Sequence, residues 1–89
     1  MTPERNQNIS DSDLIRGCME SDRRMQEELY RRFSPRMYAV CLRYAGHAEE
    51  AEDILQEGFI NVFKKLDSFR NEGSFEGWIR RVMVFTSIN

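Results

Sequence analysis

The chain has 89 residues, of which 40% are hydrophobic, and its 13 Lys and Arg against 15 Asp and Glu give a formal net charge of −2. This length corresponds to one small domain, near the lower limit of sizes that fold without disulfides or metals. Cys18, Cys41 and the single His47 form neither a disulfide framework nor a metal-ligand set, so no metal or other cofactor is expected. No signal peptide opens the chain and no run of about twenty apolar residues follows, which predicts a soluble, cytoplasmic protein.

The small net charge conceals two segments of opposite sign. Residues 48–63 contain five acids and no base, whereas residues 64–81 contain five bases against three acids. A charge average near zero argues against non-specific nucleic-acid binding by the whole surface. The segregation, in contrast, suits a bridge between a basic protein and an anionic nucleic acid.

Helical periodicity without strand-like alternation predicts an all-α domain, a compact bundle of four to five helices over residues 10–89. Residues 1–9 are polar and are expected to form a disordered tail. Ser10 or Asp11 is expected to cap the first helix, and Ser21 the second.

The second helix is expected to end near Ser34-Pro35, because serine as N-cap and proline in the first turn are typical of a helix start. The resulting third helix would end at Gly46, in a left-handed conformation. His47 is expected to cap or decorate the turn that follows. A fourth helix, residues 49–66, should be the longest or second longest, and a last one should begin near Ser74. The expected inward stripes of the last four helices contain Met25, Leu29 and Phe33, then Met37, Val40, Cys41 and Tyr44, then Leu55, Phe59, Val62, Phe63 and Leu66, then Phe75, Trp78, Ile79 and Val82.

A polar, glycine-containing loop over residues 70–74 lies between Phe69 and Phe75. Binders of single-stranded nucleic acid combine cations for phosphates with aromatic surfaces for bases. Two side chains of the loop can hydrogen-bond to a base edge, and three arginines in or after it can contact phosphates. These are Asn71 and Ser74 for the base, and Arg70, Arg80 and Arg81 for the phosphates. The competing interpretation is that the aromatic residues only close a small core, which is favoured for Phe75 and Trp78 and stays open for Phe69.

Three motifs at fixed spacing identify a resemblance. They are Ala51-Glu52-Asp53-Ile54-Leu55-Gln56-Glu57 with Phe59, then Leu66-Asp67-Ser68-Phe69-Arg70, then Phe75 with Trp78-Ile79. Over nearly its whole length the chain resembles region two of bacterial RNA polymerase sigma factors, specifically the extracytoplasmic-function (ECF) group. The resemblance implies a transcription initiation factor that binds core RNA polymerase and that recognises and melts the minus-ten promoter element.

The resemblance also implies roles for particular residues. Asp53, Gln56 and Glu57 resemble the residues that bind the clamp helices of the polymerase's largest subunit. The loop and the last helix resemble the part that recognises the non-template strand of promoter DNA. One base would be flipped into a pocket that involves Phe69, Val82 and Lys65. Membrane-associated anti-sigma factors, which cover these surfaces in the family, are a further partner class.

Two features concern the last helix. The family commonly has Asn where this chain has Phe85, so a base contact there is either lost or replaced by stacking. Asn89 fits a second Asn of the family's helix. The helical pattern reaches Asn89 without a stop signal, which leads us to expect a truncated chain that lacks the family's second promoter-binding domain.

An enzyme is not expected, because the chain has a single histidine and no paired nucleophile and base, and its carboxylates are arrayed as on a surface. Neither catalytic residues nor a small-molecule substrate are therefore predicted. The alternative function is an all-helical adaptor that binds only protein, through its acidic face. Residues 70–81 discriminate the two, because an adaptor has no use for a glycine loop between aromatic residues followed by arginines.

Overall fold

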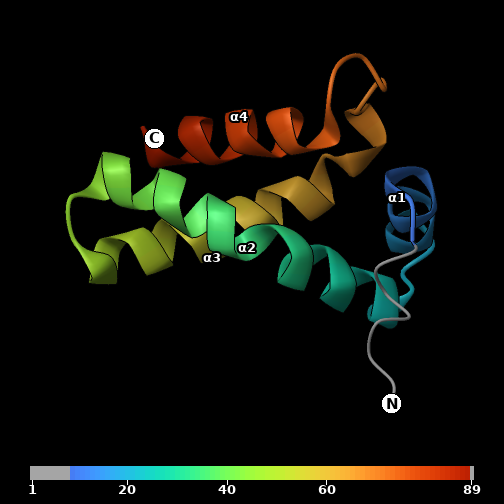
Figure 1. The fold of residues 1–89 in the computed structure, drawn as a ribbon, viewed down its shortest axis with the longest axis horizontal. Coiled ribbons are helices and arrows are strands. Elements are labelled where there is room, and N and C mark those ends of the chain that lie inside the picture. The colour runs from blue at the N-terminus through green and yellow to red at the C-terminus, as the bar shows by residue number, and fades with distance from the viewer. Residues whose placement is uncertain (1–8, 89) are drawn as a thin grey trace.

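The computed structural model describes residues 9–88, which form four α-helices and one short 3₁₀ helix (Figure 1). In chain order these are α1 (Asp11–Met19), α2 (Arg23–Ala45), α3 (Ala48–Lys64), η2 (Leu66–Ser68) and α4 (Phe75–Ser87). The described residues contain no strand, so the predicted all-α fold is confirmed. The prediction that α3 is the longest or second-longest helix is also confirmed, since its 17 residues are exceeded only by the 23 of α2.

Helix α2 corrects the prediction of a helix boundary at Ser34-Pro35. Pro35 lies inside one continuous helix (Figure 1), and Ser34 does not cap a new one. An interior proline removes one backbone hydrogen bond and costs about 3 kcal/mol. That cost is offset by packing, because Phe33 before the proline and Met37 after it are both buried in the same core.

The other helix ends follow ordinary capping chemistry. Ser10 Oγ accepts a hydrogen bond from the Asp13 N–H at 3.1 Å, as expected for a cap of α1. The expected Ser21 cap of α2 is wrong by one residue: the cap is Asp22, whose carboxylate accepts from the Arg24 N–H at 3.0 Å. Ser21 instead occupies the preceding turn with a φ of 63°.

The turn between α2 and α3 agrees with the prediction. Gly46 has a φ of 89°, in the left-handed region that glycine tolerates best. His47 caps α3, with Nδ1 accepting from the Glu50 N–H at 3.4 Å. The chain thereby reverses within two residues and lays α3 back along α2 (Figure 1).

The core lies where α2, α3 and α4 pack against one another, with α1 against the N-terminal part of α2 (Figure 1). Most residues of the expected stripes are buried, but Tyr44, in the last turn of α2, is 52% exposed, so its assignment to the inward stripe is wrong. Trp78, expected to be mostly buried, is half-buried and packs against the core. The buried apolar residues of the described chain are Leu14, Cys18, Leu29, Phe33, Met37, Cys41, Ala51, Leu55, Phe59, Val62, Leu66, Phe75, Ile79 and Met83.

Specific contacts fix α4 against its two neighbours. Gly58 of α3 is buried against Met83 of α4, which is fully buried. Beside this contact, the Asn61 side-chain amide donates to Thr86 Oγ1 at 3.0 Å. On the other side, Arg36 of α2 forms an ion pair with Glu76 of α4. These contacts hold α4 in one orientation on the bundle.

The start of the described chain is tied to α2 through Arg32, which pairs with a buried carboxylate. Glu28 is 5% exposed and pairs with Arg31 at 2.6 Å and with Arg32 at 3.3 Å. Arg32 Nη1 also donates to the Ile9 carbonyl at 3.0 Å. Ile9 is the last residue of the expected tail and packs partly against the core. Residues 1–8 and Asn89 lie outside the described residues. The expectations of a disordered tail and of a family-like asparagine at position 89 therefore fall outside them as well.

Candidate functional site

The acidic surface predicted on α3 is exposed. Asp53, Gln56 and Glu57 all reach solvent along this helix. Beside them is a hollow of about 420 Å³ between α2 and α3, and Gln56 lines it whereas Asp53 and Glu57 do not. Its remaining lining residues are Tyr30, Ser34, Pro35 and Tyr38 of α2 with Glu52 and Leu55 of α3.

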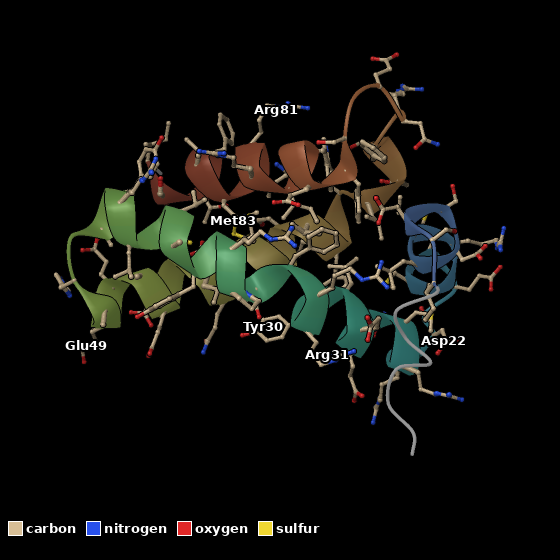
Figure 2. All side chains as sticks on the ribbon, viewed as in Figure 1. Asp22, Tyr30, Arg31, Glu49, Arg81 and Met83 are labelled. Atoms are coloured by element: carbon tan, nitrogen blue, oxygen red, sulfur yellow. The ribbon has the colours of Figure 1, made fainter. Side chains whose placement is uncertain are left out.

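Two tyrosines of this hollow were not predicted as site residues. Tyr30 is 41% exposed and rests edge-on against Phe59, with ring centroids 4.9 Å apart. In Figure 2 it projects from the face of α2 opposite α4. Tyr38 is half-buried, two turns further along the same helix. Their eight-residue spacing along α2 is a signal in the sequence, but only the packing of α3 against α2 makes them the wall of a groove. We call this hollow the tyrosine groove.

The aromatic residues around the loop form one cluster. Phe75 is 3% exposed and meets Phe33 at a centroid distance of 5.6 Å, so it belongs to the core. Phe69 is half-buried, with its ring centroid 5.2 Å from Phe75 and 5.5 Å from Trp78. Phe69 therefore packs on the core with one side and remains accessible on the other.

The accessible side of Phe69 lines a hollow of about 580 Å³ between α1 and the segment that follows α3. Asn71, one of the predicted base-reading residues, lines the same hollow, as do Ile15 and Met19 of α1. Val82 and Lys65, predicted to share a pocket with Phe69, are not among the residues that line it. Lys65 instead places its ammonium group 5.7 Å from the ring centroid of Phe85.

Of the two predicted base-reading residues of the loop, one has a free side chain and the other is engaged in a cap. Asn71 and Gly73 adopt positive φ values of 62° and 84°, so the loop makes two sharp turns. Ser74 caps α4, because its Oγ accepts from the Gly77 N–H at 2.9 Å. Asn71 and Arg70 are exposed. Of the two predicted base-reading residues, Asn71 is thus the one whose side chain has no role in capping.

The two arginines of α4 point to different places. Arg81 projects away from the bundle in Figure 2, on the opposite side from Tyr30. Arg80 is also exposed but lies at the junction of α4 with α2. Phe85, one turn beyond Arg81, is 58% exposed. The surface of α4 around Arg81 thus combines a cation with an accessible ring.

The two cysteines of the described residues are buried thiols. Burial raises the pKa of the Cys18 thiol to about 11, with a smaller contribution from the Asp22 carboxylate, and burial also raises the pKa of Cys41. Both thiols are therefore protonated and unreactive at neutral pH. Among residues 9–88 no group of three or more His, Cys, Asp or Glu side chains is placed to hold a metal ion. None of the helices there has the length and apolar character to cross a membrane.

Comparison with protein families identifies the family to which this chain belongs. The model of sigma-70 region 2 matches residues 29–89. The chain belongs to the sigma-70 region 2 family. The match begins within α2, so it includes the tyrosine groove, the acidic face of α3, the loop and α4, while α1 precedes it.

Individual relatives of this region 2 domain agree with the family match. The chain is 28% identical over 79 residues to the RNA polymerase sigma-H factor of Pseudomonas aeruginosa, which covers 89% of this chain and 41% of that protein. It is 39% identical over 56 residues to the ECF RNA polymerase sigma factor SigE of Mycolicibacterium smegmatis, covering 63% of this chain and 21% of the relative. It is 35% identical over 57 residues to the ECF RNA polymerase sigma factor SigW of Bacillus subtilis, covering 64% and 30%. The resemblance to ECF sigma factors is confirmed, and the chain spans between about a fifth and two-fifths of the length of these relatives.

Proposed function

We propose that this domain acts in bacterial transcription initiation, by binding core RNA polymerase and by recognising and melting the minus-ten promoter element. The relatives are RNA polymerase sigma factors by name, which supports the general role. The observation that carries the proposal is the placement of two unlike surfaces on one bundle. An acidic face with an aromatic groove lies on α2 and α3, and a loop with an arginine-bearing helix lies on the other side (Figures 1 and 2).

The tyrosine groove and the acidic residues suit a basic helix of the polymerase. The groove supplies an apolar floor from Leu55 and two aromatic walls, and Gln56 lies at its margin. Asp53 and Glu57 add negative charge on the exposed side of the same helix. A helix that docks in a groove presents apolar anchors inward and charges at the rim. We therefore assign the clamp helices of the largest subunit to this surface.

Charge reversal tests the polymerase interface. Asp53→Lys and Glu57→Lys are each expected to weaken binding to core polymerase about 5- to 100-fold, because one charge-assisted contact is replaced by repulsion. Titration of labelled domain with core polymerase measures this. Glu49→Lys is the matched control, since Glu49 is an exposed acid in the first turn of the same helix and is not one of the predicted contact residues. Equal affinities for all four proteins would move the interface elsewhere.

The loop and the outer side of α4 suit a single DNA strand. Phe69 offers an accessible ring, Asn71 a free amide, and Arg81 a cation that projects from the surface. Rings hold unstacked bases, amides read base edges and arginines bind phosphates. We propose that the non-template strand lies along this path and that the hollow beside Phe69 receives a flipped base.

Two substitutions separate the reading of bases from the binding of phosphates. Arg81→Ala should weaken binding of single-stranded, minus-ten-like DNA equally for every sequence and lower the salt slope by about 0.7. Asn71→Gly should relax the preference at one base and leave the salt slope unchanged, and glycine keeps the positive φ without strain. Ser74→Ala is less informative, because it also removes the cap of α4. If neither variant changes DNA binding while the polymerase variants fail to bind, the domain is an adaptor for protein alone.

A further inference from the structure

The hollow beside Phe69 has two walls of different origin. One wall comes from the segment that follows α3 and includes Asp67, Phe69 and Asn71. The other is formed by α1, which contributes more than half of the lining residues, among them Ile15, Arg16, Met19 and Glu20. We call these four residues the α1 wall. Helix α1 precedes the segment matched by the model of sigma-70 region 2, so the α1 wall lies outside that match.

Helix α1 is held firmly against α2, so the α1 wall is in place before a ligand binds. A Cβ built on Gly17 would overlap the Met25 side chain, which shows how closely the two helices pack. At the start of α1, Arg32 of α2 lies 3.6 Å from the Asp11 carboxylate. Leu14 of α1 is fully buried in the core. A site that is already formed loses less conformational entropy on binding.

Apolar side chains line the hollow from both walls. Ile15 is half-buried and Met19 is 53% exposed on the α1 wall, and the accessible side of Phe69 lies on the other. Nucleobases stack on aromatic rings and tolerate apolar contact on their faces. The volume of about 580 Å³ falls within the range of roughly 300–1,000 Å³ that is usual for sites of small ligands. The hollow therefore has the space and the surfaces for one base.

Two carboxylates also line the hollow, Glu20 from the α1 wall and Asp67 from the other wall. Within residues 9–88 neither forms an ion pair, and Arg16, the one cation of the lining, is paired with Asp13 at 2.5 Å. Glu20 is the C-cap of α1, where the helix dipole disfavours a negative charge. Ionised carboxylates only accept hydrogen bonds. The polar part of the hollow therefore favours a ligand that donates them.

We propose that Glu20 and Asp67 select a base that carries an exocyclic amino group. Cytosine and adenine donate from such a group, whereas thymine has a carbonyl oxygen in the corresponding place, which a carboxylate would repel. This inference rests on the proposed function, since it concerns the base that the hollow receives. Asn71 reads this base from the loop, and Glu20 adds a specificity-determining contact from α1.

Pairs of single strands that differ in one functional group test the proposal. A labelled, minus-ten-like strand with cytosine is compared with the same strand carrying uracil, in which a carbonyl replaces the amino group. Adenine is compared with hypoxanthine in the same way, and each position along the strand is examined by fluorescence anisotropy at low salt. At one position the chain should bind the amino form about 5- to 20-fold more tightly than the carbonyl form.

Three variants assign this preference to the α1 wall. Glu20→Ala should remove most of the preference, because it deletes an acceptor from the hollow. Glu20→Gln keeps one acceptor oxygen and should retain part of the preference. Glu27→Ala, at an exposed acid of α2, is the matched control for the lost charge. It should strengthen binding of all strands to the same small extent as Glu20→Ala and leave the preference unchanged.

The outcomes separate this proposal from the function on which it rests. A chain that binds amino and carbonyl forms equally well at every position would overturn the proposal, and so would a preference that survives in Glu20→Ala. Both results are compatible with base reading by Asn71 and with phosphate binding by Arg81. Single-strand binding that ignores Arg81→Ala and Asn71→Gly would instead count against the proposed function. Circular dichroism of each variant confirms that the helices are retained.

Discussion

At the scale of single residues, Gly58 shows how closely two helices can approach when one side chain is missing. A Cβ built on Gly58 would lie 2.3 Å from the Met83 sulfur, well inside contact distance. Met83 is fully buried in the core, so its side chain can move only by displacing other packed groups. The glycine therefore sets the distance between α3 and α4.

Gly58→Ala is expected to lower the free energy of unfolding by about 1–3 kcal/mol, the usual range for overpacking a core. The better helix propensity of alanine, worth about 1 kcal/mol, works in the opposite direction and places the result in the lower part of this range. Urea denaturation followed by circular dichroism measures the change. Met83→Val shortens the opposing side chain, so the double variant should lose less than the sum of the two single losses. Additive losses would show that the new methyl group does not press on Met83.

At the scale of elements, α2 shows where local sequence rules and tertiary packing disagree. Ser34-Pro35 has the composition of a helix start, and on that local signal alone a boundary is the better prediction. Met25, Leu29 and Phe33, however, continue at the same four-residue spacing through Met37 and Cys41 on the far side of the proline. In the molecule the unbroken apolar stripe prevails. The general rule is that packing of an apolar face outweighs one missing backbone hydrogen bond.

Pro35→Ala separates the two effects of this proline. The substitution restores an N–H to the interior of α2 and should raise the free energy of unfolding by about 1–3 kcal/mol, less a fraction for the greater entropy of the unfolded chain. Pro35 also lines the tyrosine groove, so affinity for core polymerase should fall even as stability rises. Thermal denaturation and polymerase titration on the same samples give both values. A variant that is more stable and binds polymerase equally well would remove Pro35 from the interface.

The candidate site was predictable from the sequence as far as single elements go. The acidic residues of α3 are exposed as expected, and Phe75 belongs to the core as expected. The sequence did not reveal the tyrosine groove or the hollow between α2 and α4. Each is formed by side chains from two helices, and the packing of these helices is a tertiary property. Tyr30 lines the tyrosine groove only because α3 packs beside α2. Arg43 and Arg80 line a common hollow only because α4 packs beside α2.

At the scale of the whole molecule, the surfaces proposed for the two partners lie on different sides of one bundle. Glu57 is on α3, and Arg81 projects from α4 away from the bundle (Figure 2). Sites that share no contacts generally contribute independently. Glu57→Lys should therefore leave single-strand binding unchanged, Arg81→Ala should leave polymerase binding unchanged, and the double variant should show both losses undiminished. Measuring both affinities for all three variants tests this, and a loss of DNA binding in Glu57→Lys alone would show that the two surfaces communicate.

Helix α2 contributes to both sides of the molecule, and this has a consequence for how the chain can tolerate change. Pro35 lines the tyrosine groove, whereas the next residue, Arg36, lines a hollow between α2 and α4, and Met37 after that is buried in the core. Inserting or deleting one residue here would turn everything up to Ala45 by about 100° about the helix axis. Arginines would then face the core and core residues would face solvent, so the fold and both proposed contacts would be lost together. Exposed side chains along α2 can be exchanged one at a time, but its length between Pro35 and Gly46 has no such freedom.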